Sequence, residues 1–150
     1  MARRLELLAD SFHRLLGRRL IPQGSGDPAE ALWRAPFVVV AHDTRADPVF
    51  FFGNAVALRA FETDWTGLTA MPSRFSAEAP ARGERQRLLD RVSRDGFIDD
   101  YSGIRVSATG RRFRIGNAVV WNIADDAGHR HGQAAMFAPP PFVADGGPGY

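Results

Sequence analysis

The chain has 150 residues, and its 19 basic and 17 acidic residues leave a formal net charge of +2, which describes one nearly neutral domain. All the basic residues are arginine, which excludes a lysine Schiff base or a lysine general base. Cysteine is absent. This excludes thiolate nucleophiles, disulfides, thiolate-bound zinc, iron–sulfur clusters and a photochemical flavin adduct on sulfur.

Residues 1–21 carry an amphipathic pattern. Leu5, Leu8 and Phe12 recur at helical spacing and arginines occupy the other faces, which predicts an N-terminal helix. We expect it to pack on the domain or on a second copy, rather than on a membrane or a nucleic acid. Residues 22–29 are rich in glycine and proline and predict a linker.

The main domain is expected over residues 30–138. Apolar, β-branched runs at 36–42 and 49–52 predict two strands of a hairpin. A short helix is predicted after Asn54, short turns follow, and a longer helix over 81–95 ends at Gly96.

The last third of the chain changes to a period of two. Strands are predicted over 104–108, 113–123 and 130–137, with turns at 109–110 and 125–128. Apolar residues fall on alternate positions of the middle strand: Phe113, Ile115, Val119, Trp121 and Ile123. Residues 139–150 are rich in proline and glycine and predict a loose tail.

This order of elements favours an α+β fold. One five-stranded antiparallel sheet takes its outer strands from the two hairpins, and the central helices cover one face. The layout resembles that of PAS domains.

Residues 47–65, with the sequence DPVFFFGNAVALRAFETDW, resemble the signature of the MEKHLA domain, a PAS-like module. Further blocks agree in the same order, at 71–78, 83–89, 102–113, 115–121 and 132–135. The resemblance covers roughly residues 30–138. Several blocks in one order are far more specific than a single motif.

The resemblance implies a PAS-like fold and a sensing or interaction module. In land plants the MEKHLA domain ends class III homeodomain-leucine-zipper transcription factors, where it is regarded as regulatory. Free-standing copies occur in bacteria and algae without an assigned activity. This chain has neither a homeodomain nor a zipper, so the transcription-factor role does not carry over.

A PAS-like arrangement encloses an apolar pocket between the sheet and the short helices. The candidate pocket residues, for an unknown ligand or cofactor, are Asn54, Trp65, Arg74, Arg105, Trp121 and Gln133. Asn54 is also expected to cap the helix that follows it. The two tryptophans would fill core or pocket wall, with Asn122 or Gln133 accepting an indole N–H bond.

Arginines near this pocket suit carboxylate or phosphate ligands. The candidates are Arg74, Arg82, Arg85 and Arg105, and the competing interpretation is that they form surface ion pairs. Arg105 stands out because it interrupts a β-branched strand, where it faces either solvent or the pocket.

The histidines and the arginine cluster are expected to be solvated surface groups. His129 and His131 share one face of a strand and His42 ends another, but we expect solvated strand ends and no metal site. Nucleic-acid binding through residues 111–114 is not expected. No membrane contact is expected, because no apolar run approaches the roughly 20 residues of a membrane span, and we expect a cytoplasmic location.

The sequence therefore predicts a regulatory module that is not an enzyme. It would act by sensing a small molecule, by protein–protein interaction, or by both, with self-association as a homo-oligomer. The alternative hypothesis is a small enzyme acting on an organic acid, with His42 or Asp43 as the base.

Overall fold

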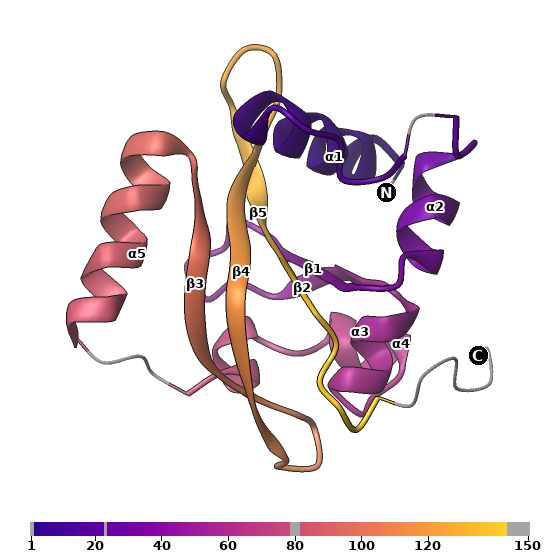
Figure 1. Cartoon of the computed structure of the whole chain (residues 1–150), viewed down its shortest axis with the longest axis vertical. Coiled ribbons are helices and arrows are strands. Elements are labelled where there is room, and N and C mark those ends of the chain that lie inside the picture. Colours follow the sequence, from indigo (N-terminus) through magenta and orange to yellow (C-terminus); the bar gives the residue numbers. More distant parts are fainter. Residues whose placement is uncertain (1, 23, 79–81, 144–150) are drawn as a thin grey trace.

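The computed structural model describes residues 2–22, 24–78 and 82–143 (Figure 1). The helices are α1 (Ala2–Leu16), α2 (Pro28–Arg34), α3 (Ala55–Ala60), α4 (Trp65–Thr69), the 3₁₀ helix η1 (Ser73–Ser76) and α5 (Arg82–Asp95). The strands are β1 (Val38–His42), β2 (Phe50–Gly53), β3 (Phe97–Val106), β4 (Arg112–Ala124) and β5 (Arg130–Phe137).

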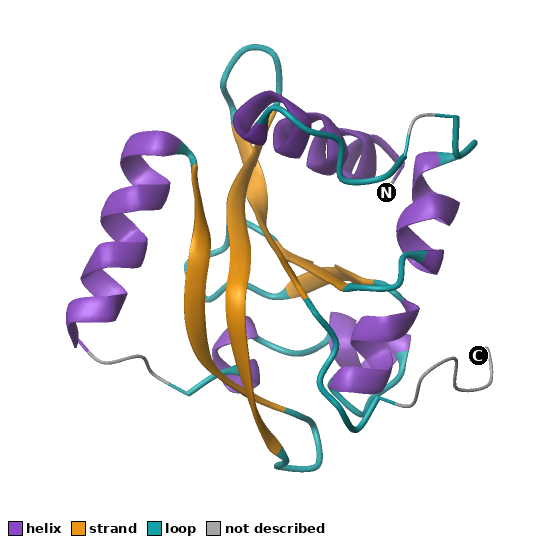
Figure 2. Cartoon of the chain, viewed as in Figure 1, coloured by secondary structure: helices purple, strands orange, loops and turns teal. Residues whose placement is uncertain are grey.

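The strands form one sheet in the order β2-β1-β5-β4-β3, and every neighbouring pair is antiparallel (Figure 2). The predicted five-stranded sheet, with a hairpin pair at each edge, is confirmed. Strands β1 and β5 meet in the middle because β5 returns from the last hairpin to pair with the first one.

The sheet separates two apolar cores. Its inner face packs against α3, α4 and α5, where Val40, Val120 and Ala135 join the core around Phe61. Its outer face packs against α1, where Trp121 joins a second core. Neighbouring residues of a strand point to opposite faces, so Val120 and Trp121 belong to different cores.

Helix α1 lies across the outer face of the sheet (Figure 1). Phe12 packs edge-to-face on Trp121 with ring centroids 4.9 Å apart. The Ser11 hydroxyl donates to the carbonyl of Ala124 (3.1 Å) and accepts its N–H (3.0 Å). Gly17, with φ of 74°, ends the helix before residue 20, because glycine readily adopts that left-handed conformation. The apolar face of α1 is thus buried on the chain's own sheet.

Strand β4 contains an extra residue. Between Ile115 and Ala118 it advances three residues while β3 advances two, and Asn117 has a φ of 49°. This bulge reverses the alternation. Phe113 and Ile115 therefore face the inner core, whereas Trp121 faces the outer one.

Three segments differ from the sequence prediction. Helix α2 was not predicted, and it begins within the predicted linker. Asp27 caps this helix by accepting the N–H of Ala29. Strand β3 begins at Phe97 rather than at 104. In the predicted loose tail, Phe142 packs edge-to-face on Phe113 at 5.6 Å, while residues 144–150 lie outside the described part of the chain.

Candidate functional site

A cavity of about 290 Å³ lies between the inner face of the sheet and the two elements η1 and α5. Strands β1, β3, β4 and β5 form its floor. Its lining combines an apolar set with a smaller polar set. The main lining residues are Val40, His42, Phe50, Arg74, Glu78, Leu88, Leu89, Tyr101, Arg105, Val120, Gln133 and Ala135.

Arg105 is the cationic group of this cavity. It is partly buried, and its guanidinium carbon lies 6.0 Å from the ring centre of Phe137. Burial lowers the pKa of Arg105, although arginine stays charged in proteins. Within the described residues, no carboxylate forms an ion pair or a hydrogen bond with it. Strand β3 thus places the positive charge of Arg105 in a mostly apolar cavity, where no carboxylate of the described residues pairs with it.

Tyr101 lies two positions away from Gly103 and four from Arg105, on the same strand. Its side chain is buried and lines the cavity. A Cβ atom at Gly103 would lie 3.3 Å from the Tyr101 hydroxyl oxygen, so the glycine gives the phenol ring room along the strand. A phenol hydroxyl beside a guanidinium adds a second hydrogen-bond donor to this end of the cavity.

His42 and Gln133 form a polar pair at the end of β1. They are cross-strand neighbours, and their side chains interact. Desolvation lowers the pKa of His42, which keeps the ring neutral near pH 7. Its Nδ1 donates to the carbonyl of Asp43 at 2.9 Å, which leaves Nε2 as an acceptor. The Gln133 amide also donates to the side chain of Asn122 at 3.3 Å.

Arg74 lies at the rim of the cavity. Its side chain is 61% exposed, and its Nε donates to Asp47 at 3.0 Å. It also stacks over Phe75, 4.2 Å from the ring centre. Glu78, another lining residue, accepts a hydrogen bond from Arg112 at 3.0 Å. Arg74 is thus an ion-paired surface residue, as its competing interpretation held. The side chains of Arg82 and Arg85 lie outside the described part of the structure.

The other three predicted pocket residues lie elsewhere. Asn54 is buried at the start of α3, where it caps the helix as expected. Trp65 packs edge-to-face on Trp33 (6.3 Å) and Phe52 (6.0 Å). Trp121 lies on the outer face, and its indole N–H donates to the carbonyl of Leu8 (3.1 Å) rather than to Asn122 or Gln133. The structure therefore brings Arg74, Arg105 and Gln133 together and leaves these three outside.

Sequence reasoning missed several lining residues. Tyr101 falls in the first half of β3, which was not predicted as a strand. Leu88 and Leu89 lie in the helix predicted over 81–95 but were not proposed as pocket residues, yet Leu89 is 51% exposed and lines the cavity. The spacing of Tyr101, Gly103 and Arg105 on alternate positions was the available signal for one shared strand face.

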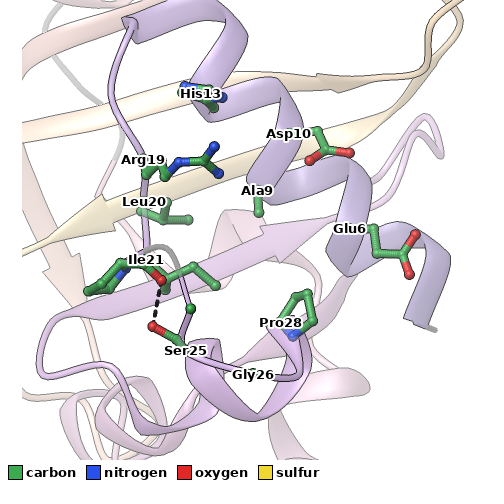
Figure 3. A pocket seen from close by; sticks show the side chains of 12 residues that line it. Glu6, Ala9, Asp10, His13, Arg19, Leu20, Ile21, Ser25, Gly26 and Pro28 are labelled. Atoms are coloured by element: carbon green, nitrogen blue, oxygen red, sulfur yellow. Dashed lines mark hydrogen bonds between the residues drawn. The ribbon is translucent and has the colours of Figure 1, made fainter.

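A larger hollow of about 400 Å³ lies between α1 and the loop that leads to α2 (Figure 3). Glu6, Asp10 and His13 project from α1 along one side, and the Ser25 hydroxyl donates to the Pro22 carbonyl on the other. These side chains are exposed, so they keep their hydration without a ligand. This surface groove is a weaker candidate than the cavity under α5.

The turn between β4 and β5 holds Asp125 and two histidines. His131 Nε2 lies 2.9 Å from the Asp125 carboxylate, and the backbone N–H groups of His129 and Ala127 also donate to it. The cluster stabilises the hairpin turn. Among the described residues, no group of three or more potential ligands is placed to hold a metal ion.

Asp125 makes stability depend on pH in the acid range. The hydrogen bond from His131, followed by that from the His129 backbone, lowers the pKa of Asp125 to about 2 from 3.8. A depressed pKa in the folded state adds stability above pH 4 that declines as the pH falls towards 2. We expect Asp125→Asn to be less stable than wild type at pH 6, and this difference to close by about pH 2 in urea titrations. Asp126→Asn, at a fully exposed neighbour, is the matched control and should leave the stability at pH 6 close to that of wild type.

Comparison with solved structures shows that the fold is that of PAS and light-oxygen-voltage domains. The structure of an RNA-binding light-oxygen-voltage receptor matches with a TM-score of 0.64 and 16% identity, covering 80% of this chain and 35% of that one. A PAS domain from Colwellia psychrerythraea matches with a TM-score of 0.59 and 11% identity, covering 74% of this chain and 92% of that one. At these identities the likeness concerns the fold alone.

The chain belongs to the MEKHLA domain family, whose model matches residues 2–139. The match includes α1 and the first two residues of α2, which were expected to precede the domain. The homeobox-leucine zipper protein HOX10 of Oryza sativa subsp. indica is 24% identical over 139 residues, which is 91% of this chain and 17% of that protein. ATHB-14 of Arabidopsis thaliana is 27% identical over 124 residues, 81% of this chain and 15% of that protein. The chain thus spans less than a fifth of these relatives.

In the described residues, no helix is both long and apolar enough to cross a membrane.

Proposed function

We propose that this MEKHLA domain is a regulatory module that binds a small molecule in the cavity beneath α5. One observation carries the proposal: a mostly apolar cavity of about 290 Å³ holds a cation, Arg105, that no described carboxylate balances. Ligand pockets typically start at about 300 Å³ and combine apolar walls with a few placed polar groups. The cavity has this size and this composition.

Binding is favoured over catalysis by the surroundings of His42. A catalytic histidine is usually oriented by a carboxylate and faces the substrate through its other nitrogen. Among the described residues, His42 Nδ1 donates to a backbone carbonyl instead. The other candidate base, Asp43, accepts the N–H groups of Arg45 and Val49 and is committed to its turn.

The proposed function involves ligand binding and does not include self-association through α1. The element expected to mediate self-association, α1, already buries its apolar face against β4. A second copy would need a different surface.

Filling the cavity tests this proposal. Ala135 lines the cavity from β5, so Ala135→Leu adds a branched side chain to the space a ligand would occupy. We expect the neutral probe 3-phenylpropionamide to bind wild type and to bind this variant at least about tenfold more weakly, as measured by titration calorimetry. The matched control is Ala138→Leu, the same change at an exposed residue three positions later, which should bind like wild type.

Native mass spectrometry of the purified chain adds a readout independent of the probe. A mass excess that wild type and Ala138→Leu share, and that Ala135→Leu lacks, would place a retained molecule in the cavity. If wild type retained no molecule and gave no heat with the probe, the proposal would fail.

A further inference from the structure

The structure assigns a ligand class to this cavity: we propose that it binds a small monocarboxylic acid with an apolar body, held by the Arg105 guanidinium. This inference rests on the proposed function and adds the chemistry of the ligand to it.

The first argument is the charge of the cavity. A guanidinium carries five N–H donors in a fixed fork that matches the two oxygens of a carboxylate. At Arg105 the described residues supply no carboxylate, and its guanidinium carbon lies 6.0 Å from the ring centre of Phe137. An arginine charge that is partly withdrawn from water, as at Arg105, is costly unless an anion compensates it. A bound carboxylate would supply that compensation.

The second argument is the number of charges. A phosphate group carries up to two negative charges and calls for several cationic donors. The other described arginine of the cavity, Arg74, is at the rim and already donates to Asp47. Glu78, also on the lining, would repel additional negative charge. One unpaired guanidinium, with the Tyr101 hydroxyl beside it, fits a single carboxylate.

The third argument is the shape of the remaining space. Away from Arg105, apart from polar residues such as His42 and Gln133, the walls are mostly apolar, with Leu88 and Leu89 from α5 and Val40 and Val120 from the sheet. An apolar body removed from water there contributes binding free energy in proportion to the buried area. The ligand therefore has one charged end and an apolar remainder, which excludes short polyanions and sugars.

A matched pair of probes separates the charge from the shape. 3-Phenylpropionate and 3-phenylpropionamide share one apolar body and differ in the charged group. We expect the acid to bind wild type about 10- to 100-fold more tightly than the amide by titration calorimetry, since a hydrogen bond to a charged group is worth that much. Arg105→Met should abolish this preference and keep the binding of the amide.

Arg114→Met is the control for net charge. Arg114 is an exposed residue of β4, so this variant loses the same charge as Arg105→Met outside the cavity. It should keep the preference for the acid. The melting temperature without ligand gives a second readout: Arg105→Met should melt at or above the wild-type temperature, because it removes an uncompensated charge.

The outcomes separate this inference from the proposed function. Equal binding of acid and amide by wild type would overturn the carboxylate inference and leave the proposed ligand cavity standing. The same holds if Arg105→Met kept the preference for the acid. Binding of neither probe by wild type would overturn both. A lower melting temperature of Arg105→Met, together with an unchanged preference, would show that Arg105 serves the fold and not the ligand.

Discussion

Replacing Asn54 with alanine is expected to lower the free energy of unfolding by about 3–5 kcal/mol. The side-chain oxygen of Asn54 accepts the N–H groups of Val39 (3.1 Å) and Ala57 (3.0 Å). Its amide donates to the carbonyls of Leu32 (3.1 Å) and Phe37 (2.8 Å). Alanine would leave buried backbone groups of four segments without partners, in addition to removing the cap of α3. Equilibrium urea unfolding measures the difference.

Asn122→Ala is the matched control for this prediction. Asn122 is half-buried, and its two side-chain hydrogen bonds, to Val92 and from Gln133, are both 3.3 Å long. We expect its loss to cost about 1 kcal/mol. Equal costs for the two asparagines would contradict the view that Asn54 joins α2, β1 and α3.

Replacing Trp121 with alanine should lower the free energy of unfolding by about 3–5 kcal/mol and release α1 from the sheet. Trp121 is fully buried, packs edge-to-face on Phe12, and donates its indole N–H to the Leu8 carbonyl. Its loss leaves a cavity directly beneath the helix. Amide hydrogen exchange measures the effect: relative to wild type, exchange in α1 should speed up more than exchange in β5.

The matched control is Trp65→Ala. Trp65 is 37% exposed and touches Trp33 and Phe52 at the surface, so less of its area is removed from water. We expect a smaller loss of stability and unchanged exchange in α1. If both variants left α1 equally protected, the outer core would not depend on the indole.

Much of the fold could be predicted from local patterns. The hairpin pairs, helix α5 with Gly96 at its end, and the final meander follow from periodicity and turn residues. The first half of β3 was not predicted as a strand, because Asp99 and Asp100 are exposed and this edge strand has two register shifts in its pairing. Helix α2 was not predicted because Asp27 and Pro28 are also typical of linkers, although the same pair starts a helix.

The candidate site was predictable only in part. Arg105 was proposed because it interrupts a β-branched strand, and Gln133 was proposed as a possible partner of a buried indole; both line the cavity. Whether Arg105 faces solvent or the cavity depends on how α5 and η1 pack over the sheet, which no local pattern contains. Trp121 was misplaced because its alternation with Ile115 is broken by the bulge, and the Gly116–Asn117 pair was the only sign of it.

The bulge also gives strand β4 one residue more than regular pairing with β3 needs. Its N-terminal half is anchored by pairing with β3, and its C-terminal half pairs with β5 as well. Removing one residue at Gly116–Asn117 would therefore give a regular strand in which Trp121 still points at α1 and Val120 at the ligand cavity. A deletion after Ala118, with the bulge kept, would instead exchange the two faces of the rest of the strand. Strand β4 can thus lose a residue at the bulge and keep both cores, whereas the same loss further along would turn its end inside out.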